Sequence, residues 1–294
     1  MKRARLIYNP TAGREMIAKK LPQLLAVLEQ AGYETSCHAT TGRGYATKEA
    51  RIAAERGEDV VIAAGGDGTI HEVVNGLAEF PNPPALGILP GGTTNDLARA
   101  LKLPRDLEEA CKVIAKGNTV DVDVGVFGDK YFINVAAAGR LTEVTYEAPS
   151  RLKSMVGPLA YYAKAIEKLG SLHHPFPVEL QTPRGKWKSE IWLIIIANSV
   201  SVGGFERLAP EASLNDGLFD VLIIPKANIP DLLHLAALAR KGEHIRDSRI
   251  IYFQTDELEI NTPISLKLNL DGEWGGELSG KVKMLPRHLK IFCP

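Results

Sequence analysis

Apolar and polar residues follow two different rhythms along this chain, and the change comes near residue 119. Before it, short apolar runs typical of buried strands are separated by stretches with apolar residues at i, i+3 and i+4, the spacing of an amphipathic helix. The pattern predicts strands at 6–8, 33–40, 59–64 and 85–89, and helices at 17–28, 45–56 and 70–78. Strands that alternate with helices of this length indicate a parallel, doubly wound α/β sheet.

After residue 119 the segments are short, are bounded by Gly, Pro, Asn or Asp, and often alternate polar and apolar residues. Such segments predict an antiparallel β domain, a sandwich or a barrel. We expect strands at 120–127, 130–135, 177–182, 186–196, 219–224, 249–255, 257–260, 265–270 and 280–285, with helices at 158–169 and 229–241. The predicted organisation is therefore an α/β domain at 1–124 and a β-rich domain at 125–294, whose C-terminal tail can return to the first domain.

The composition argues against some classes of function but does not indicate a particular one. With 45% hydrophobic and 24% charged residues the chain is an ordinary globular protein. Lys+Arg and Asp+Glu both number 35, which argues against a nucleic-acid binder because such proteins carry a basic excess. Three cysteines lie far apart without a CxxC pair, so we predict no disulfide framework and a reducing cytosol. The longest apolar runs fall well short of the ~20 residues of a spanning helix, so any membrane contact is expected to be peripheral.

Candidate chemistry begins at the turn Gly65-Gly66-Asp67-Gly68-Thr69, which joins a buried strand to a helix. Glycine allows the backbone to approach a ligand closely, and successive N–H groups at such a turn form a nest for an anion such as phosphate. Asp67 does not suit this role, because a bare carboxylate repels phosphate. Its presence makes sense only with a cation or a hydroxyl between the carboxylate and the phosphate, which suggests Mg²⁺.

A second turn of the same kind, Pro90-Gly91-Gly92-Thr93-Thr94-Asn95-Asp96, follows the next strand. Two such turns at corresponding strand ends favour a phosphate site over simple tight turns, although Asn95 could serve only as a helix cap. The chain has no G-x-x-x-x-G-K-[ST] sequence, and its first strand–helix turn lacks G-x-G-x-x-G. We therefore expect a nucleotide to be bound without either of these two motifs.

These two turns resemble the diacylglycerol kinase catalytic domain, and nearly the whole chain is similar to the soluble bacterial members of that lipid-kinase family, which are related to sphingosine and ceramide kinases. The resemblance extends to Asn9-Pro10-Thr11-Ala12-Gly13, to Ala209-Pro210-Glu211-Ala212 with Asn215-Asp216-Gly217-Leu218, and to Leu270-Asp271-Gly272-Glu273. NAD kinases share the fold and the GGDG loop. The implied fold is an NAD kinase/diacylglycerol kinase-like α/β domain followed by an antiparallel β-sandwich.

The resemblance also implies roles for individual residues. ATP, the co-substrate, is expected to contact Asn9, Pro10, Thr11, Ala12, Gly13, Thr40, Gly65, Gly66, Asp67, Gly68, Thr69, Ile70, His71, Glu72 and Thr93. The implied magnesium ligands are the Asp216 carboxylate and the main-chain carbonyls of Ser213 and Leu218. Asp271 is implied as the catalytic base, aided by Glu273 and by a water-linked acidic network through Asp67 and Asp123.

The implied activity is transfer of the ATP γ-phosphate to a lipid hydroxyl, in the cytoplasm and with transient peripheral contact with a membrane surface; a homodimer is compatible with it. An NAD kinase and a non-enzymatic lipid or nucleotide sensor are the alternatives. Asp271 and Asp216 each lie before a glycine and could be plain turn residues. For membrane contact we consider the helix at 158–169 and four basic residues, Arg240, Lys241, Arg246 and Arg249, all of which could equally be ordinary surface features.

Overall fold

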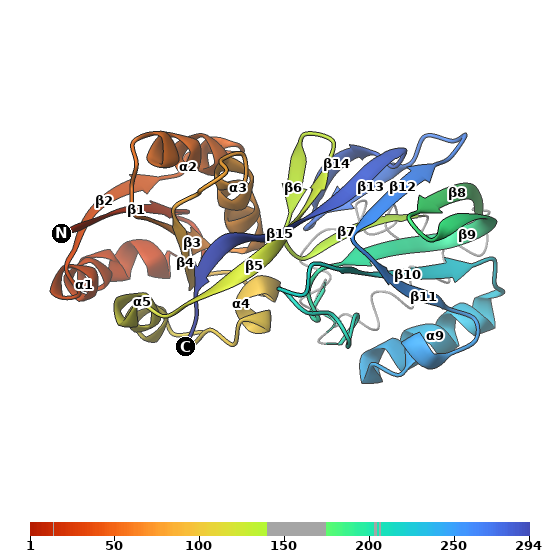
Figure 1. The fold of residues 1–294 in the computed structure, drawn as a ribbon. Coiled ribbons are helices and arrows are strands. Elements are labelled where there is room, and N and C mark those ends of the chain that lie inside the picture. Colours follow the sequence, from red (N-terminus) through yellow and green to blue (C-terminus); the bar gives the residue numbers. More distant parts are fainter. Residues whose placement is uncertain (14, 140–174, 203–204, 206) are drawn as a thin grey trace. The chain divides into compact units, whose positions relative to one another are not determined.

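The computed structural model describes residues 1–13, 15–139, 175–202, 205 and 207–294 (Figure 1). The chain forms two compact units. Unit 1 comprises 1–124, 131–133 and 285–294, and unit 2 comprises 125–130 and 134–284. Three strands have residues in both units: β5 (Thr119–Phe127), β6 (Lys130–Phe132) and β15 (Gly280–Phe292).

Unit 1 is a parallel sheet between helices. Its strands run in the order β2 (Tyr33–Ala39), β1 (Lys2–Tyr8), β3 (Val60–Gly65) and β4 (Ala85–Pro90), and Ile291 of β15 pairs in parallel with Leu86. Helices α2 (Tyr45–Glu55) and α3 (Asp67–Leu77) lie on one side of the sheet, with α1 (Met16–Gln30) and α5 (Leu107–Lys116) on the other (Figure 1). Every residue of β3 is buried, because helices cover both faces, and this is why the strand is a continuous apolar run.

Helix α5 was not predicted, although its ends carry clear signals. Asp106 accepts hydrogen bonds from the N–H groups of Glu108 and Glu109, at 2.9 and 3.1 Å, and Gly117 ends the helix with φ of 82°. These are an N-cap followed by acidic residues and a C-terminal glycine. The five-residue helix α4 (Asp96–Ala100) begins where Asn95 and Asp96 were expected to start a helix.

Unit 2 is built mainly from antiparallel strands. Its sheet has the order β14 (Glu273–Glu277), β13 (Lys267–Leu270), β7 (Val135–Gly139), β9 (Gly185–Ala197), β8 (Phe176–Thr182), β12 (Glu257–Asn261) and β15, while β10 (Phe219–Pro225) pairs with both β9 and β11 (Ile251–Thr255). The described residues of unit 2 also include helix α9 (Ile229–Lys241) and the short 3₁₀ helix η1 (His244–Arg246). Leu232 and Leu222 belong to the apolar core that α9 shares with β9 and β10.

The predicted fold class, a doubly wound α/β domain and a β-sandwich domain, is confirmed. The strand predicted at 130–135 is instead two strands, because Asn134, between β6 and β7, directs its N–H to the side chain of Asp271. Strand β14 was not predicted, since Gly275 and Gly276 obscure its pattern. The helix predicted at 158–169 lies outside the described residues. Among the residues that are described, no helix is both long enough and apolar enough to span a membrane.

Candidate active site

Three predicted loops of unit 1 follow the carboxyl ends of β1, β3 and β4, the edge at which open α/β sheets bind ligands. The loop after β1 is organised by Asn9, whose side-chain oxygen accepts hydrogen bonds from the N–H and hydroxyl of Thr11, at 3.0 and 2.9 Å. The Asn9 N–H donates to the carbonyl of Ala64 at the end of β3. Thr40, after β2, donates its N–H to Tyr8. These bonds join the ends of neighbouring strands.

The loops after β3 and β4 are in direct backbone contact. The Gly91 N–H donates to the Gly65 carbonyl at 2.7 Å. A Cβ on residue 92 would lie 2.7 Å from the Gly66 Cα and 2.8 Å from the Asn95 Oδ1, whereas a Cβ on residue 66 would meet its nearest neighbour at 3.4 Å. Gly66 itself has extended backbone, with φ of −87° and ψ of −175°. Gly92 is therefore the residue at which this contact requires glycine.

Asp67 and Glu72 use their carboxylates to hold helix starts. Asp67 accepts the N–H groups of Asn95 and Asp96, at 2.9 and 2.8 Å, at the beginning of α4. Glu72 accepts the N–H groups of Gly44 and Ala46, at 2.8 and 3.0 Å, at the beginning of α2. Backbone N–H groups thus offset part of the Asp67 charge. The cation or hydroxyl that the sequence suggested beside this carboxylate stays a prediction.

Asp123 is fully buried on β5 and accepts the N–H of Arg287 at 2.6 Å. Arg287 has φ of 52°, a conformation that costs a residue with a side chain about 1 kcal/mol. The Asp123 carboxylate therefore stabilises a strained position of β15. Its proposed part in a water-linked network with Asp67 stays a prediction.

In unit 2, Asp271 lies in the turn between β13 and β14 and is held by the start of β7. Its Oδ1 accepts the N–H groups of Asn134 and Val135, at 2.8 and 2.9 Å, and its own N–H donates to the Val135 carbonyl at 2.9 Å. Asp271 adopts φ of 52°, and such strain persists where surrounding contacts over-determine the conformation and is concentrated at functional sites. Glu273 begins β14 opposite Leu270.

The loop proposed to bind magnesium lies immediately before β10. The Asp216 Oδ1 accepts the N–H of Leu218 at 3.0 Å, and the Ser213 hydroxyl donates to Asn215 at 3.0 Å. Ser213, Asp216 and Leu218 are thus part of one short loop. Their donor atoms are all oxygens, the ligands that Mg²⁺ takes in proteins.

Next to this loop, Asp220 is fully buried and surrounded by further acidic groups. Its Oδ1 is hydrogen-bonded to the Tyr252 hydroxyl, its Oδ2 has no partner, and the same hydroxyl lies 3.3 Å from Glu211. Burial raises the pKa of Asp220, and the negative charges of Asp216 and Glu211 raise it further. This excess of negative charge fits a nearby divalent cation. No three His, Cys, Asp or Glu side chains in the described part of the chain converge as metal ligands. Mg²⁺ usually keeps several waters and is bound by only one or two carboxylates.

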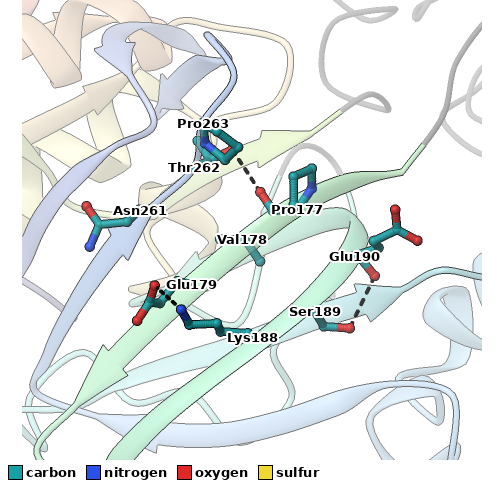
Figure 2. Close-up of a pocket in the computed structure, with 9 residues that line it drawn as sticks. All are labelled: Pro177, Val178, Glu179, Lys188, Ser189, Glu190, Asn261, Thr262 and Pro263. Atoms are coloured by element: carbon teal, nitrogen blue, oxygen red, sulfur yellow. Dashed lines mark hydrogen bonds and ion pairs between the residues drawn. The ribbon is translucent and has the colours of Figure 1, made fainter.

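A surface hollow of about 490 Å³ on β8, β9 and the end of β12 is distinct from these loops (Figure 2). It contains none of the predicted site residues. Glu179 and Lys188, which line it, form an ion pair of 2.8 Å, and Glu190 pairs with Lys226 at 3.0 Å. Because its charges already have partners, we do not treat it as a candidate active site.

The basic residues considered for lipid head groups have different environments. Arg249 forms ion pairs with Asp231, at 2.6 Å, and Asp247, at 2.7 Å, so its charge is already engaged within unit 2. Arg240 and Lys241 lie in the last turn of α9, where cations favour the helix dipole. The ion pairs favour the ordinary surface reading for Arg249, while membrane contact by Arg240, Lys241 and Arg246 stays a prediction.

An α/β unit with glycine-rich turns and a β unit with two aspartate turns define the class of kinases that share the diacylglycerol kinase and NAD kinase architecture. The diacylglycerol kinase catalytic domain model matches residues 3–127, and the YegS C-terminal NAD kinase beta sandwich-like domain model matches 135–293. The chain belongs to the diacylglycerol kinase family and is an ATP-dependent lipid kinase.

Individual relatives match along more than nine-tenths of their length. A diacylglycerol kinase of Bacillus subtilis is 52% identical, covering 100% of this chain and 97% of the relative. One from Staphylococcus aureus is 46% identical, with 100% and 93% covered. A crystal structure of a diacylglycerol kinase from Bacillus anthracis has a TM-score of 0.84 at 26% identity and covers 100% of this chain and 97% of that one.

Proposed function

We propose that the chain transfers the γ-phosphate of ATP to the free hydroxyl of diacylglycerol or a closely similar lipid, with Asp271 as the general base. The substrate follows from the names of its relatives. The observation that supports the base is that the N–H groups of Asn134 and Val135 both donate to one carboxylate oxygen of Asp271, a residue at positive φ. A strained and firmly held carboxylate is more than a plain turn requires.

In the proposed reaction the lipid hydroxyl loses its proton to the Asp271 carboxylate as its oxygen bonds to the γ-phosphorus. The bond from the γ-phosphorus to the β–γ bridging oxygen breaks, and ADP leaves. Phosphoryl transfer needs positioning, charge neutralisation and a base. The glycine-rich loops of unit 1 supply backbone N–H groups for the phosphates, and Mg²⁺ held by Ser213, Asp216 and Leu218 would supply positive charge.

The acceptor also determines where the protein works. A diacylglycerol resides in a bilayer, so we propose transient, peripheral association with a membrane surface. This part of the proposal rests on the acceptor's chemistry. No membrane-binding face is assigned by it.

The decisive experiment replaces Asp271 by Asn, which removes the proton acceptor and keeps the volume. General-base assistance is worth roughly 10²–10⁴ in rate, so turnover on diacylglycerol in mixed micelles should fall at least about a hundredfold. Thermal stabilisation by ATP should persist. Asp256→Asn, a change at an exposed aspartate in another turn of unit 2, is the matched control and should keep normal turnover.

Near-normal turnover of Asp271→Asn would contradict the proposed base. Assays of the unsubstituted protein with diacylglycerol and with other lipid alcohols test the acceptor, because transfer to another lipid without transfer to diacylglycerol would contradict the proposed acceptor.

A further inference from the structure

A buried group of polar residues lies behind the Asp271 turn in unit 2. Asn198 and Ser199 are fully buried just after β9, Ser201 is 2% exposed, and Asn134 before β7 is 7% exposed. Burying polar side chains costs free energy unless they are hydrogen-bonded. The position of this group suggests that its hydrogen bonds serve the neighbouring turn.

Asn134 is held from two sides by the segment after β9. The Ser199 hydroxyl lies 3.1 Å from the Asn134 side-chain oxygen, and the Asn198 N–H donates to the Asn134 carbonyl at 2.8 Å. The Ser199 hydroxyl is also 3.0 Å from the Ser201 carbonyl. Since a hydroxyl has one proton, Ser199 donates to one of these acceptors at a time, and both lie within hydrogen-bonding distance.

The same Asn134 holds the carboxylate of Asp271 through its N–H, at 2.8 Å, while Val135 adds a second N–H at 2.9 Å. A continuous series of hydrogen bonds thus runs from Ser199 through Asn134 to Asp271. It stays within unit 2 and joins three segments of the chain. Any shift of Asn134 is passed to the carboxylate oxygen that its N–H binds.

We propose that Ser199 is a positioning residue for catalysis, which acts by holding Asn134 and through it the Asp271 carboxylate. The inference rests on the proposed role of Asp271 as the base. Ser199 does not touch the reacting atoms; its hydroxyl keeps the Asn134 side chain, and hence the backbone N–H at 134, in one place. Because a displacement of about 1 Å can cost about 10²-fold in rate, losing part of this restraint should lower kcat.

The test is a double-mutant cycle between Ser199→Ala and Asp271→Asn. Ser199→Ala alone should lower kcat on diacylglycerol by roughly tenfold, a fraction of the 10²-fold that a full ångström of misplacement can cost. KM for ATP should stay within about twofold, since the proposed effect is on the base. In the Asp271→Asn background, Ser199→Ala should change the residual rate by less than about twofold, because coupled residues are non-additive.

Two further variants make the cycle specific. Ser199→Cys keeps a side chain of similar size with a weaker donor and should also lower kcat; it provides the measurement if Ser199→Ala does not fold. Ser189→Ala, at a partly exposed serine on β9, the strand that precedes Ser199, should leave kcat unchanged.

The outcomes separate the two proposals. If Asp271→Asn abolishes activity while Ser199→Ala and Ser199→Cys keep kcat within about twofold of the unsubstituted protein, the positioning role is wrong and the base stands. An equal fold-loss from Ser199→Ala in both backgrounds would also overturn it, since it would reveal a general structural effect. If Asp271→Asn is itself nearly fully active, the base assignment fails and the positioning role fails with it.

Discussion

The carboxylates of the two units differ in how far backbone N–H groups offset their charge. In unit 1, Asp67 and Glu72 each accept hydrogen bonds with both carboxylate oxygens from N–H groups at the start of a helix. The candidate surface for phosphate in this unit consists of backbone groups. In unit 2, Asp271 is held at positive φ, and Asp220 is buried with one oxygen unpartnered beside two further acids. Backbone N–H groups offset both carboxylates of unit 1, as they also do at Asp271 in unit 2, whereas the buried Asp220 keeps one oxygen without a partner and is affected by the charges of Asp216 and Glu211.

This difference matches what each half of a phosphoryl transfer requires. A surface for phosphate needs N–H groups at close range and little exposed negative charge. A site for a proton or a divalent cation needs carboxylates. We infer that the shape of unit 1 is sensitive to added atoms, whereas the chemistry of unit 2 is sensitive to lost charge.

Among substitutions that add atoms to unit 1, Gly92→Ala is expected to have the largest effect. The added Cβ would lie 2.7 Å from the Gly66 Cα, so the two glycine-rich loops must move apart. ATP affinity, measured by calorimetry, should fall by about tenfold or more, equivalent to ~1.4 kcal/mol. Gly66→Ala is the matched variant, because its added Cβ has a nearest contact of 3.4 Å and its φ is ordinary. It should disturb the fold less than Gly92→Ala does. Equal tolerance of both changes would show that the loop contact is not what shapes the site.

The comparison is sharpened by making the same substitution in each unit. Asp216→Asn should raise the Mg²⁺ concentration needed for half-maximal activity and weaken thermal stabilisation by Mg²⁺, because one charged ligand is lost. Asp67→Asn should instead lower stability by about 1–2 kcal/mol, as loss of a helix cap does, with the Mg²⁺ dependence little changed. Identical Mg²⁺ titrations of Asp216→Asn and the unsubstituted protein would show that the ion does not bind in this loop.

The smallest expected effect is a dependence of unit 2 stability on pH through His244. This side chain is 3% exposed, its Nε2 lies 2.8 Å from the Leu208 carbonyl, its Nδ1 has no partner, and burial lowers its pKa. A folded-state pKa below the unfolded value of about 6.5 means that the unfolded chain binds the proton more readily. The contribution of neutral His244 to the free energy of unfolding is therefore complete above about pH 6.5 and is lost as the pH falls through the folded-state pKa.

Thermal unfolding between pH 7.5 and pH 5, values on either side of the reference pKa of about 6.5, tests this. Tm should fall with decreasing pH more steeply for the unsubstituted protein than for His244→Gln, which cannot gain the proton. The slope from one proton is at most about 1.4 kcal/mol per pH unit. Parallel curves for the two proteins would assign the pH dependence to other groups.

The sequence by itself determined the fold class and the glycine-rich turns. Apolar runs such as the fully buried β3, and the spacing of apolar residues in α1, predicted the parallel sheet and its helices. These signals are local: a strand, a helix or a turn is encoded by residues within a few positions of one another. Helix α5 shows that further local signals, the cap at Asp106 and Gly117, were available in the sequence.

Only the tertiary structure decided which groups these residues meet. For Asp67 the sequence suggested a neighbouring cation or hydroxyl, and it did not indicate the N–H groups at the start of α4 that the carboxylate accepts. Asp271 is held by Asn134, which is 137 positions away in the chain, and Asn134 lies 65 positions from Ser199. No periodicity or turn preference spans such distances, because bonds of this kind form when packed strands bring remote segments together. The residues that carry charge could thus be identified from the sequence, while the contacts that hold them depended on the packing of the strands.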